Sequence, residues 1–255
     1  MTTAPFWPRV HSWSQRNAAR FFCVRPFIIE SQTPILSFTF DDFPRSALLT
    51  GGAILERYGL RGTYYTSLGL MGRIAPTGPI FVAEDLHALV ERDHELGCHT
   101  FDHCHSWDTK TRVYERSILE NKAALGRLVP GASFKTFSYP ISPPRPRTKQ
   151  VAGGYFACAR GGGQTINDGR TDLNYLHAYF IEKSRDNLEA IRNVIERNRA
   201  VCGWLILATH DVCSDPTPFG CTPALFEEVV RCAVRSGARI LPVADALDSL
   251  RAHDG

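Results

Sequence analysis

Two short segments of this sequence combine residue types that can bind a divalent metal ion. Asp41 and Asp42 end the apolar run 35–40, where two adjacent carboxylates repel each other unless a cation or hydrogen-bond donors stabilise them. His99 and His103 are four positions apart, so a helix or a tight loop can bring both imidazoles to one side. An acidic strand end and an incidental histidine pair are the structural alternatives. Two imidazoles and one carboxylate leave coordination positions open, as a catalytic metal requires.

A third segment adds groups that can transfer protons. The apolar run 204–209 is followed by His210 and Asp211, which could also form a capping pair at a strand end. If one carboxylate and two histidines bind the metal, a second carboxylate and a third histidine remain. These are the groups that a hydrolase uses as general base and general acid. All three segments follow apolar runs, and this combination is more specific than any one of them.

The elements that must position these groups alternate between β-rich runs and amphipathic stretches. Strands are predicted over residues 35–40, 63–66, 96–99, 136–139, 155–159, 177–181, 204–209 and 239–243. Helices are predicted over residues 85–92, 109–128 and 187–199, and a fourth begins after the N-cap Thr222 and ends at Gly237. This alternation predicts a parallel sheet with helices outside, either a barrel or a doubly wound open sheet. In both folds the chemistry lies where the strands end.

The composition suits one large α/β domain and argues against a dedicated nucleic-acid-binding protein. The chain has 255 residues and is 44% hydrophobic, which is sufficient for a full core. Its 29 basic and 26 acidic residues nearly balance, and they leave no large basic cluster. The short basic stretch 145–149 is expected to be a solvated loop, with an anion contact as the alternative.

The cysteines and the apolar runs bear on the compartment. The eight cysteines are scattered without a Cys-x-x-Cys pair, which favours reduced thiols over a disulfide framework. Cys98 and Cys104 flank the histidine pair, so metal ligation or redox control by either is the alternative to simple packing. There is no N-terminal apolar stretch of the secretory type, and no apolar run approaches the ~20 residues of a membrane span. The expectation is a cytoplasmic protein without a membrane span.

Taken together, the three motifs resemble those of the polysaccharide deacetylases, the carbohydrate esterases of family four with the NodB homology domain. Residues 39–42 (Thr-Phe-Asp-Asp) are similar to the first motif of that family. Residues 99–103 match its second motif, His-Ser/Thr-x-x-His, and residues 207–211 are similar to its last motif. The resemblance extends from about residue 35 to about residue 247. It implies an α/β fold, a single-domain deformed (β/α) barrel with about seven parallel strands. Residues 1–30 would be an N-terminal extension and residues 31–255 the catalytic domain.

The resemblance also implies a role for each residue of the three motifs. Asp42, His99 and His103 would bind one divalent metal ion, usually zinc, with cobalt, nickel or iron as other possibilities. Asp41 would act as the general base and His210 as the general acid for the leaving amine. The metal would lower the pKa of water toward ~7, which supplies hydroxide near neutrality.

The third motif departs from the family pattern. Its usual form is Arg-x-Pro-Tyr, in which the Arg orients the catalytic aspartate, whereas residues 138–141 here are Ser-Tyr-Pro-Ile. Ser138 therefore stands where the Arg is expected. Tyr139, Pro140 and Ile141 are expected at the substrate and oxyanion region, with the backbone N–H of Ile141 as a donor.

Two more carboxylates are assigned supporting roles. The fourth motif of the family, normally Asp-Trp, is not evident, and Asp172 is the candidate for its carboxylate. Asp211, next to His210, is the second supporting candidate. Either another group orients Asp41, or the chain belongs to a divergent branch of the family.

The resemblance implies hydrolysis of an N-acetyl group on an amino sugar or glycan precursor. One alternative is a metal-dependent amidohydrolase that opens cyclic ureides or imides. Another is a non-catalytic carbohydrate-binding protein on the same fold, which the missing Arg favours and the five retained site residues oppose. A non-haem iron oxygenase also uses two histidines and one carboxylate, but the His-x-Asp spacing and all-β pattern of such enzymes are absent from this sequence.

Overall fold

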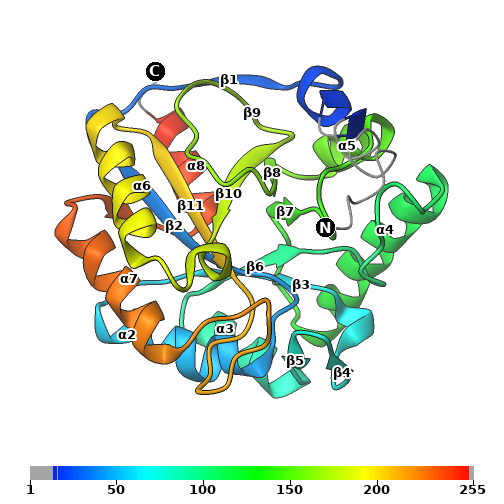
Figure 1. Ribbon diagram of the computed structural model, residues 1–255. Helices are drawn as coiled ribbons and strands as arrows, with labels where there is room; N and C mark the ends of the chain where they lie inside the picture. Colours follow the sequence, from blue (N-terminus) through cyan, green and yellow to red (C-terminus); the bar gives the residue numbers. More distant parts are fainter. Residues whose placement is uncertain (1–13, 16, 253–255) are drawn as a thin grey trace, which may run out of the picture.

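The centre of the molecule is a closed barrel of seven parallel strands (Figure 1). The computed structural model describes residues 14–15 and 17–252. The barrel strands are β2 (Ile35–Phe40), β3 (Thr63–Thr66), β6 (Glu95–Cys98), β7 (Thr136–Ser138), β8 (Cys158–Gly161), β10 (Leu176–Phe180) and β11 (Trp204–Thr209). They pair in the order β11-β10-β8-β7-β6-β3-β2, and β11 pairs with β2 along six residues to close the ring. The predicted (β/α) barrel is confirmed, and this closure excludes the open doubly wound sheet.

Helices surround the barrel on its outer side (Figure 1). They are η1 (Ala47–Gly52), α2 (Ala53–Arg57), α3 (Ala83–Glu91), α4 (Thr111–Leu128), α5 (Pro146–Tyr155), α6 (Leu188–Val201), α7 (Pro223–Arg235) and α8 (Val243–Arg251). Two short 3-10 turns, η2 (Leu68–Leu70) and η3 (Ile181–Ser184), follow β3 and β10. The remaining strands are β1 (Pro26–Ile29), β4 (Ile74–Ala75), β5 (Gly78–Pro79), β9 (Gly169–Asp172) and β12 (Arg239–Ile240). β12 pairs with the beginning of β2.

The alternation of side chains along β2 explains how the barrel separates its core from its site. Phe38 and Phe40 belong to the outer hydrophobic cluster and contact the Phe226 ring of α7. The other face begins at Ile35, the first residue of β2, which packs in a second cluster with residues of α8. Because successive residues of a strand point to opposite faces, Thr39 and Asp41 continue this inner face. The interior thus changes from apolar to polar toward the carboxyl ends of the strands.

Helix α7 forms as its end signals predict. Thr222 Oγ1 accepts a hydrogen bond from the N–H of Leu225 at 3.3 Å, and Pro223 occupies the first helical position. The helix ends just before Gly237, whose φ of +73° suits a residue without a Cβ. Its buried residues Phe226 and Val230 pack on the outer side of the barrel.

The basic stretch 145–149 is not the solvated loop that the sequence suggested. Pro146 begins α5, and Lys149 is completely buried. Its Nζ donates to the carbonyls of Ala19 and Phe22 at 2.6 and 2.9 Å and lies 2.5 Å from Asp172 Oδ2. The prediction was wrong because the partners of Lys149 are distant in the sequence. A local run of basic residues does not show that a carboxylate and two carbonyls will surround one of them in the fold.

The segment before the barrel packs against it. Residues 17–21 are helical, and β1 pairs antiparallel with β9. Arg25 donates to the carbonyls of Gly153, Phe156 and Ala157 at 2.8–3.2 Å. These contacts tie the predicted N-terminal extension to α5 and β8. The boundary at residue 30 stays a prediction.

The cysteines are all free thiols, as the scattered spacing predicted. Cys98 is buried beside Asn121, which donates to its Sγ at 3.3 Å, and burial raises the pKa of this thiol to about 12. No helix in the described part of the chain has the length and hydrophobicity needed to cross a membrane.

Candidate metal centre and active site

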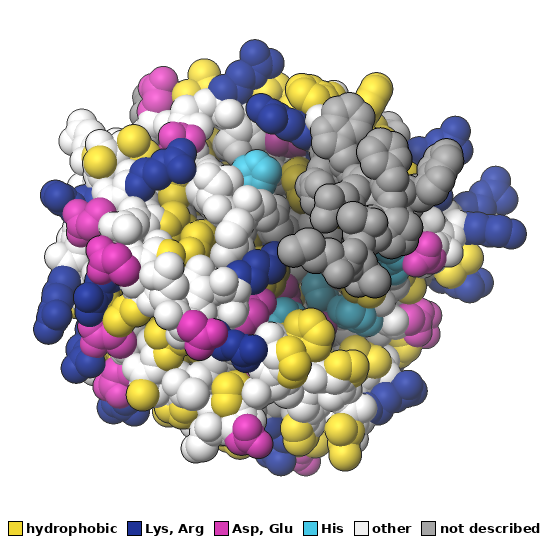
Figure 2. Space-filling model, in the orientation of Figure 1, with side chains coloured by type: hydrophobic (Ala, Val, Ile, Leu, Met, Phe, Trp, Pro, Cys, Tyr) yellow, Lys and Arg dark blue, Asp and Glu magenta, His cyan; other side chains and the backbone are white. Residues whose placement is uncertain are grey.

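A cavity of about 760 Å³ opens at the carboxyl ends of the barrel strands. Its walls include all five residues that the three motifs singled out, Asp41, Asp42, His99, His103 and His210. Figure 2 shows acidic and histidine side chains gathered at a hollow in the middle of this face. The barrel therefore brings together segments that are up to 169 positions apart, Asp41 and His210 being the extremes.

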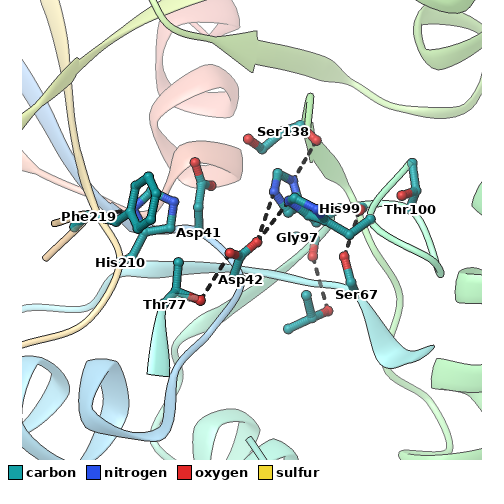
Figure 3. Close-up of polar contacts among 12 residues, drawn as sticks. Asp41, Asp42, Ser67, Thr77, Gly97, His99, Thr100, Ser138, His210 and Phe219 are labelled. Atoms are coloured by element: carbon teal, nitrogen blue, oxygen red, sulfur yellow. Dashed lines mark hydrogen bonds and ion pairs between the residues drawn. The ribbon is translucent and has the colours of Figure 1, made fainter. Parts of the chain in front are cut away.

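Asp42, His99 and His103 form a compact cluster. One ligand atom from each lies within 4.8 Å of the others. Figure 3 shows the Asp42 carboxylate and the His99 ring beside each other. Nε2 of His99 and Nε2 of His103 lie 3.5 and 3.1 Å from Asp42 Oδ1. Asp42 and His99 are buried, whereas His103 retains part of its surface toward the cavity. Two histidines and one carboxylate in this arrangement suit a divalent metal with open coordination positions.

The hydrogen bonds around the cluster fit a metal ion. Asp42 Oδ1 is buried and accepts no hydrogen bond from the described residues, although Thr77 Oγ1 donates to its other oxygen at 3.1 Å. His99 Nδ1 lies 2.8 Å from the carbonyl of Ser138, an acceptor that places its proton on Nδ1 and leaves Nε2 as the ligand atom. A buried carboxylate oxygen without a donor is costly unless a cation neutralises it. The residues therefore fit a metal ion that Asp42, His99 and His103 would hold.

The contacts within the cluster also shift the pKa values of Asp42 and His103. Burial by itself would raise the pKa of Asp42, but contacts with His103 and His99 outweigh burial and hold the pKa well below its usual range. Burial would lower the pKa of His103, but Asp42 outweighs it and the net shift is upward. The carboxylate is thus in the form that a metal requires.

Several residues of the site have positive φ angles. Asp42, Thr100, His103 and Ile141 have φ values of 60°, 58°, 52° and 49°. This conformation is uncommon for residues other than glycine, and for the β-branched Thr100 it is especially unfavourable. The turns that follow β2, β6 and β7 thus accept local strain, which is common where function fixes the side-chain direction.

Asp41 is held by an arginine that the sequence interpretation missed. Arg160 Nη2 lies 2.5 Å from Asp41 Oδ1, and Nη1 lies 3.0 Å from Oδ2, so the pair is bidentate. Both side chains are buried, and Arg160 also donates to Thr39 and lies over the Tyr65 ring. Burial would raise the pKa of Asp41, but the charges of Arg160 and two histidines outweigh burial and lower it. Asp41 is therefore an ionised carboxylate with a fixed orientation.

Arg160 makes the contact with Asp41 that the family resemblance assigns to the third-motif Arg. Ser138 and Arg160 are direct neighbours in the β7–β8 ladder. Adjacent residues in a parallel ladder point to the same face, so the guanidinium enters the barrel interior from one strand further along. The signal was present in the sequence, because Arg160 follows directly after the predicted strand 155–159.

His210 lies on the opposite side of Asp41 from the metal cluster in Figure 3. Its Nδ1 is 3.1 Å from the carbonyl of Phe219, an acceptor that places a proton on Nδ1 and leaves Nε2 facing other partners. The Phe180 ring stacks on the imidazole at 6.1 Å with an interplanar angle of 22°. The carbonyl and the aromatic ring together fix the imidazole at the cavity wall.

Two of the third-motif residues, Tyr139 and Ile141, line the cavity. Tyr139 is buried, its hydroxyl donates to the carbonyl of Asn174 at 2.9 Å, and its N–H donates to the carbonyl of Arg160. Pro140 is buried next to it. Ile141 is 58% exposed, and its N–H donates to no acceptor within the described residues. A free N–H at the cavity wall is available to an oxyanion.

The two supporting carboxylates lie elsewhere. Asp172 pairs with Lys149 and accepts from the N–H groups of Arg25 and Asn174, and it does not line the cavity. Asp211 is turned into the loop after β11, where it accepts from the N–H and the hydroxyl of Thr217 at 2.8 and 2.5 Å. Both contacts organise the backbone, and the structure does not bring these carboxylates to the metal cluster.

Comparisons with known proteins agree with this fold. Residues 29–154 match a family model described as polysaccharide deacetylase. A search of curated proteins finds no match. Among solved structures, the chitin deacetylase of the fungal pathogen Colletotrichum lindemuthianum is similar with a TM-score of 0.61 and 15% identity, over 86% of this chain and 89% of that one.

Two further solved structures share the fold. A family 4 acetyl xylan esterase from Clostridium thermocellum, in complex with a cobalt ion, has a TM-score of 0.60 and 21% identity, over 86% of this chain and 92% of that one. A family-four pseudoenzyme from Bacillus anthracis has a TM-score of 0.59 and 12% identity, over 86% and 66% of the two chains. At these identities the similarity demonstrates the fold.

Proposed function

The chain is a divergent member of the polysaccharide deacetylase family, and from this premise we propose that it is a metal-dependent deacetylase of an amino sugar or glycan precursor. The observation that carries the proposal is the meeting of Asp42, His99 and His103 in one cavity with Asp41 and His210. Deacetylation in general follows from the family. The metal and the N-acetylated sugar are the finer parts of the proposal.

In the proposed mechanism Asp41 acts as the general base. Its salt bridge with Arg160 keeps it ionised and fixes both carboxylate oxygens, so that Asp41 can take a proton from the attacking water. A divalent metal, when bound by the cluster of Asp42, His99 and His103, supplies Lewis-acid chemistry that acidifies water and polarises the amide carbonyl. The free N–H of Ile141 is a donor for the oxyanion that forms on this carbonyl.

His210 acts as the general acid. Its Nδ1 proton is directed to the carbonyl of Phe219, which leaves Nε2 to carry the proton that the leaving nitrogen needs. Without such a donor, the C–N bond would have to break with expulsion of a strongly basic amide anion. The Phe180 ring limits rotation of the imidazole and shields one of its faces.

The direct test measures acetate release from N-acetylated amino sugars. The wild-type protein should release acetate, lose this activity with a chelator and regain it with zinc or cobalt. Asp42→Ala and His103→Ala should abolish both the activity and stoichiometric metal binding, because each removes a ligand. Cys104→Ser, next to the cluster, serves as the control. Acetate release that Asp42→Ala and His103→Ala leave unchanged would refute the proposal.

A second candidate is a non-catalytic carbohydrate-binding protein, since a pseudoenzyme with this fold is known. The salt bridge of Arg160 to Asp41 opposes it, because a binding module has no need of an oriented, ionised base. Glycan binding without turnover under any divalent metal would favour this candidate. Formation of the ring-opened acid from cyclic ureides or imides, without acetate release from N-acetylated sugars, would identify an amidohydrolase of a different substrate class.

A further inference from the structure

Another acidic residue lines the cavity beside the proposed general acid. Glu182 lies in η3, two positions beyond the end of β10, and borders the same cavity as Asp41 and His210. The parallel pairing of Phe180 with Ala208 brings the chain segments that carry Glu182 and His210 to neighbouring places on the barrel rim. Glu182 also follows directly after the predicted strand 177–181, yet none of the three motifs includes it.

Among the described residues, no basic group forms an ion pair with this carboxyl. Oε2 of Glu182 is buried and has no hydrogen-bond partner in the part of the chain that the structure describes. Its neighbour Lys183 extends over the Phe180 ring, 5.0 Å from the centroid, instead of pairing with it. Arg160 is engaged by Asp41. A buried carboxylate oxygen without donor or cation favours the neutral acid.

The net effect of burial and of the nearby charges is in the same direction. Burial, the largest cause, raises the pKa of Glu182 to about 8, and the negative charge of Asp41 adds to this effect. The N–H of Glu182 itself and the charges of Lys183 and Arg160 oppose it without overcoming it. Burial and the charge of Asp41 thus favour a carboxylic acid over a carboxylate at this place in the cavity wall.

Two groups that follow β11, Cys221 and His210, do not neutralise or deprotonate the Glu182 carboxylic acid. The Cys221 thiol stays neutral because burial raises its pKa to about 12. His210 directs its Nδ1 toward the carbonyl of Phe219. A carboxylic acid kept neutral by an apolar site is a strong hydrogen-bond donor, which an ionised carboxylate is not.

We propose that Glu182 is a substrate-binding residue whose carboxylic acid donates a hydrogen bond to one hydroxyl oxygen of the N-acetylated sugar. The inference rests on the proposed deacetylase function and adds a recognition element to the same site. The reacting acetamide has its own partners in the metal cluster, Asp41, His210 and the N–H of Ile141. A sugar hydroxyl is the remaining substrate group that needs a donor. A site built to hydrogen-bond a hydroxyl discriminates against the analogue that lacks it.

Glu182→Leu and Glu182→Gln separate this role from a structural one. The probes are the methyl glycoside of N-acetylglucosamine and a set of analogues that each lack one hydroxyl. Glu182→Leu should lower kcat/KM for the parent sugar about 10- to 100-fold, the range for a lost hydrogen bond in a buried site. It should have little effect on the one analogue without the partner hydroxyl. Glu182→Gln keeps a neutral donor and should retain kcat/KM within a few-fold.

The pH profile gives an independent readout. In the wild type, kcat/KM should fall as pH rises through about 8, because ionisation of Glu182 removes its proton. This part of the alkaline limb should be absent in Glu182→Gln. Glu189→Gln on the exposed face of α6 is the matched control and should behave as the wild type.

Two outcomes would overturn the proposal. One is an equal loss in Glu182→Leu for all sugars, and the other is a loss in Glu182→Gln as large as in Glu182→Leu. If the wild type releases no acetate, the deacetylase function has failed, and calorimetric binding of the same sugars to the wild type and Glu182→Leu still tests the role of Glu182.

Discussion

At the scale of residues, the proposed chemistry depends on a carboxylate and an arginine that come from separate strands. Asp41 follows β2 and Arg160 belongs to β8, and their bidentate contact is buried. A planar guanidinium holds both oxygens of a carboxylate, which a lysine cannot do. Arg160 is therefore a positioning residue that acts through Asp41.

Replacing Arg160 should lower turnover without removing the metal. Arg160→Met should reduce kcat by roughly 100-fold, because a general base contributes at least this much and would lose its orientation and charge. The kcat of Arg160→Lys should lie between those of the wild type and Arg160→Met, since a lysine keeps the positive charge but loses the bidentate contact. Steady-state kinetics with metal analysis checks this. Wild-type kcat in Arg160→Met, with the fold intact, would show that Asp41 needs no partner.

The decline of kcat/KM at low pH gives a second test of the same variants. Burial raises the pKa of Asp41 and Arg160 opposes burial, so removal of the arginine should move this pKa upward. The pH at which kcat/KM declines on the acid side should therefore be higher in Arg160→Met than in the wild type. A purely structural role for Arg160 would leave the limb in place.

The sequence predicted the residues of the three motifs, because two carboxylates or two imidazoles near one another are distinctive. Arg160 and Glu182 were not predicted as site residues, although each directly follows a predicted strand. A single Arg or Glu after a strand is common, and only the closed barrel shows that these two face the cavity. The cluster geometry depends on tertiary contacts that no local pattern contains.

At the scale of elements, the β7–β8 ladder explains why the chain tolerates Ser138 in place of an arginine. Ser138 and Arg160 are paired, so both side chains start from neighbouring points on the inner face of the barrel. The carbonyl of Ser138 still supports His99. The guanidinium is thus supplied by a neighbouring strand while the ligand support stays on β7.

Exchanging the two residues tests this relation. Arg160→Ser should lose activity as Arg160→Met does, and adding Ser138→Arg should restore part of it because the arginine returns to a neighbouring register position. Activity of the double variant relative to Arg160→Ser is the measurement. A double variant no better than Arg160→Ser, with an intact fold, would contradict an exchange of roles between the two strands.

Helix α5 and β9 secure the segment that precedes the barrel. The buried Lys149 connects Asp172 with the carbonyls of Ala19 and Phe22. Removing one partner of a buried pair leaves the other charge unpaired. Neither Lys149 nor Asp172 lines the cavity, so we expect the contact to contribute to stability and not to catalysis.

Lys149→Met should lower the free energy of unfolding by about 3 kcal/mol or more, which is the usual effect of breaking a buried pair. The kcat of the folded protein should be unchanged. Denaturant unfolding and kinetics provide the two readouts, with Arg147→Met on the exposed side of α5 as control. A selective loss of kcat in Lys149→Met or Asp172→Asn would return Asp172 to the active site.

The elements themselves were predicted unevenly. Residues 35–40, 63–66 and 204–209 are strands with the predicted bounds, because these completely buried runs are rich in β-branched, aliphatic and aromatic residues. The strand predicted over 155–159 begins later, at Cys158, because α5 continues to Tyr155. The strand predicted over 239–243 is shorter in the structure, where β12 covers only Arg239–Ile240. Residues 243–251 form α8, a helix that was not predicted.

At the scale of the whole molecule, a buried histidine outside the cavity makes a contact that requires its neutral form. His94 Nδ1 accepts a hydrogen bond from the N–H of Gly62 at 2.9 Å, and Nε2 lies 3.1 Å from Glu56. The ring is buried, and burial lowers the pKa of His94 even though Glu56 opposes it. Protonation of Nδ1 would break the contact with Gly62.

The unfolded chain should therefore bind a proton at His94 at higher pH than the folded protein does. The stabilising contribution of His94 is present above its unfolded pKa of about 6.5 and is lost as pH falls through the lower folded value. The melting temperature should decline below pH 6.5, and His94→Asn, which keeps an acceptor for Gly62, should reduce this decline. An identical pH dependence in both proteins would exclude His94 as the cause.

The most direct measurement of the central claim is a crystal structure with zinc, with anomalous scattering to locate the ion. We predict one site in the cavity, with Asp42, His99 Nε2 and His103 Nε2 at about 2.0–2.2 Å and at least one position open to the cavity. An ion bound by Cys98 or Cys104 instead, or no ion near these three side chains at saturating zinc, would contradict the account.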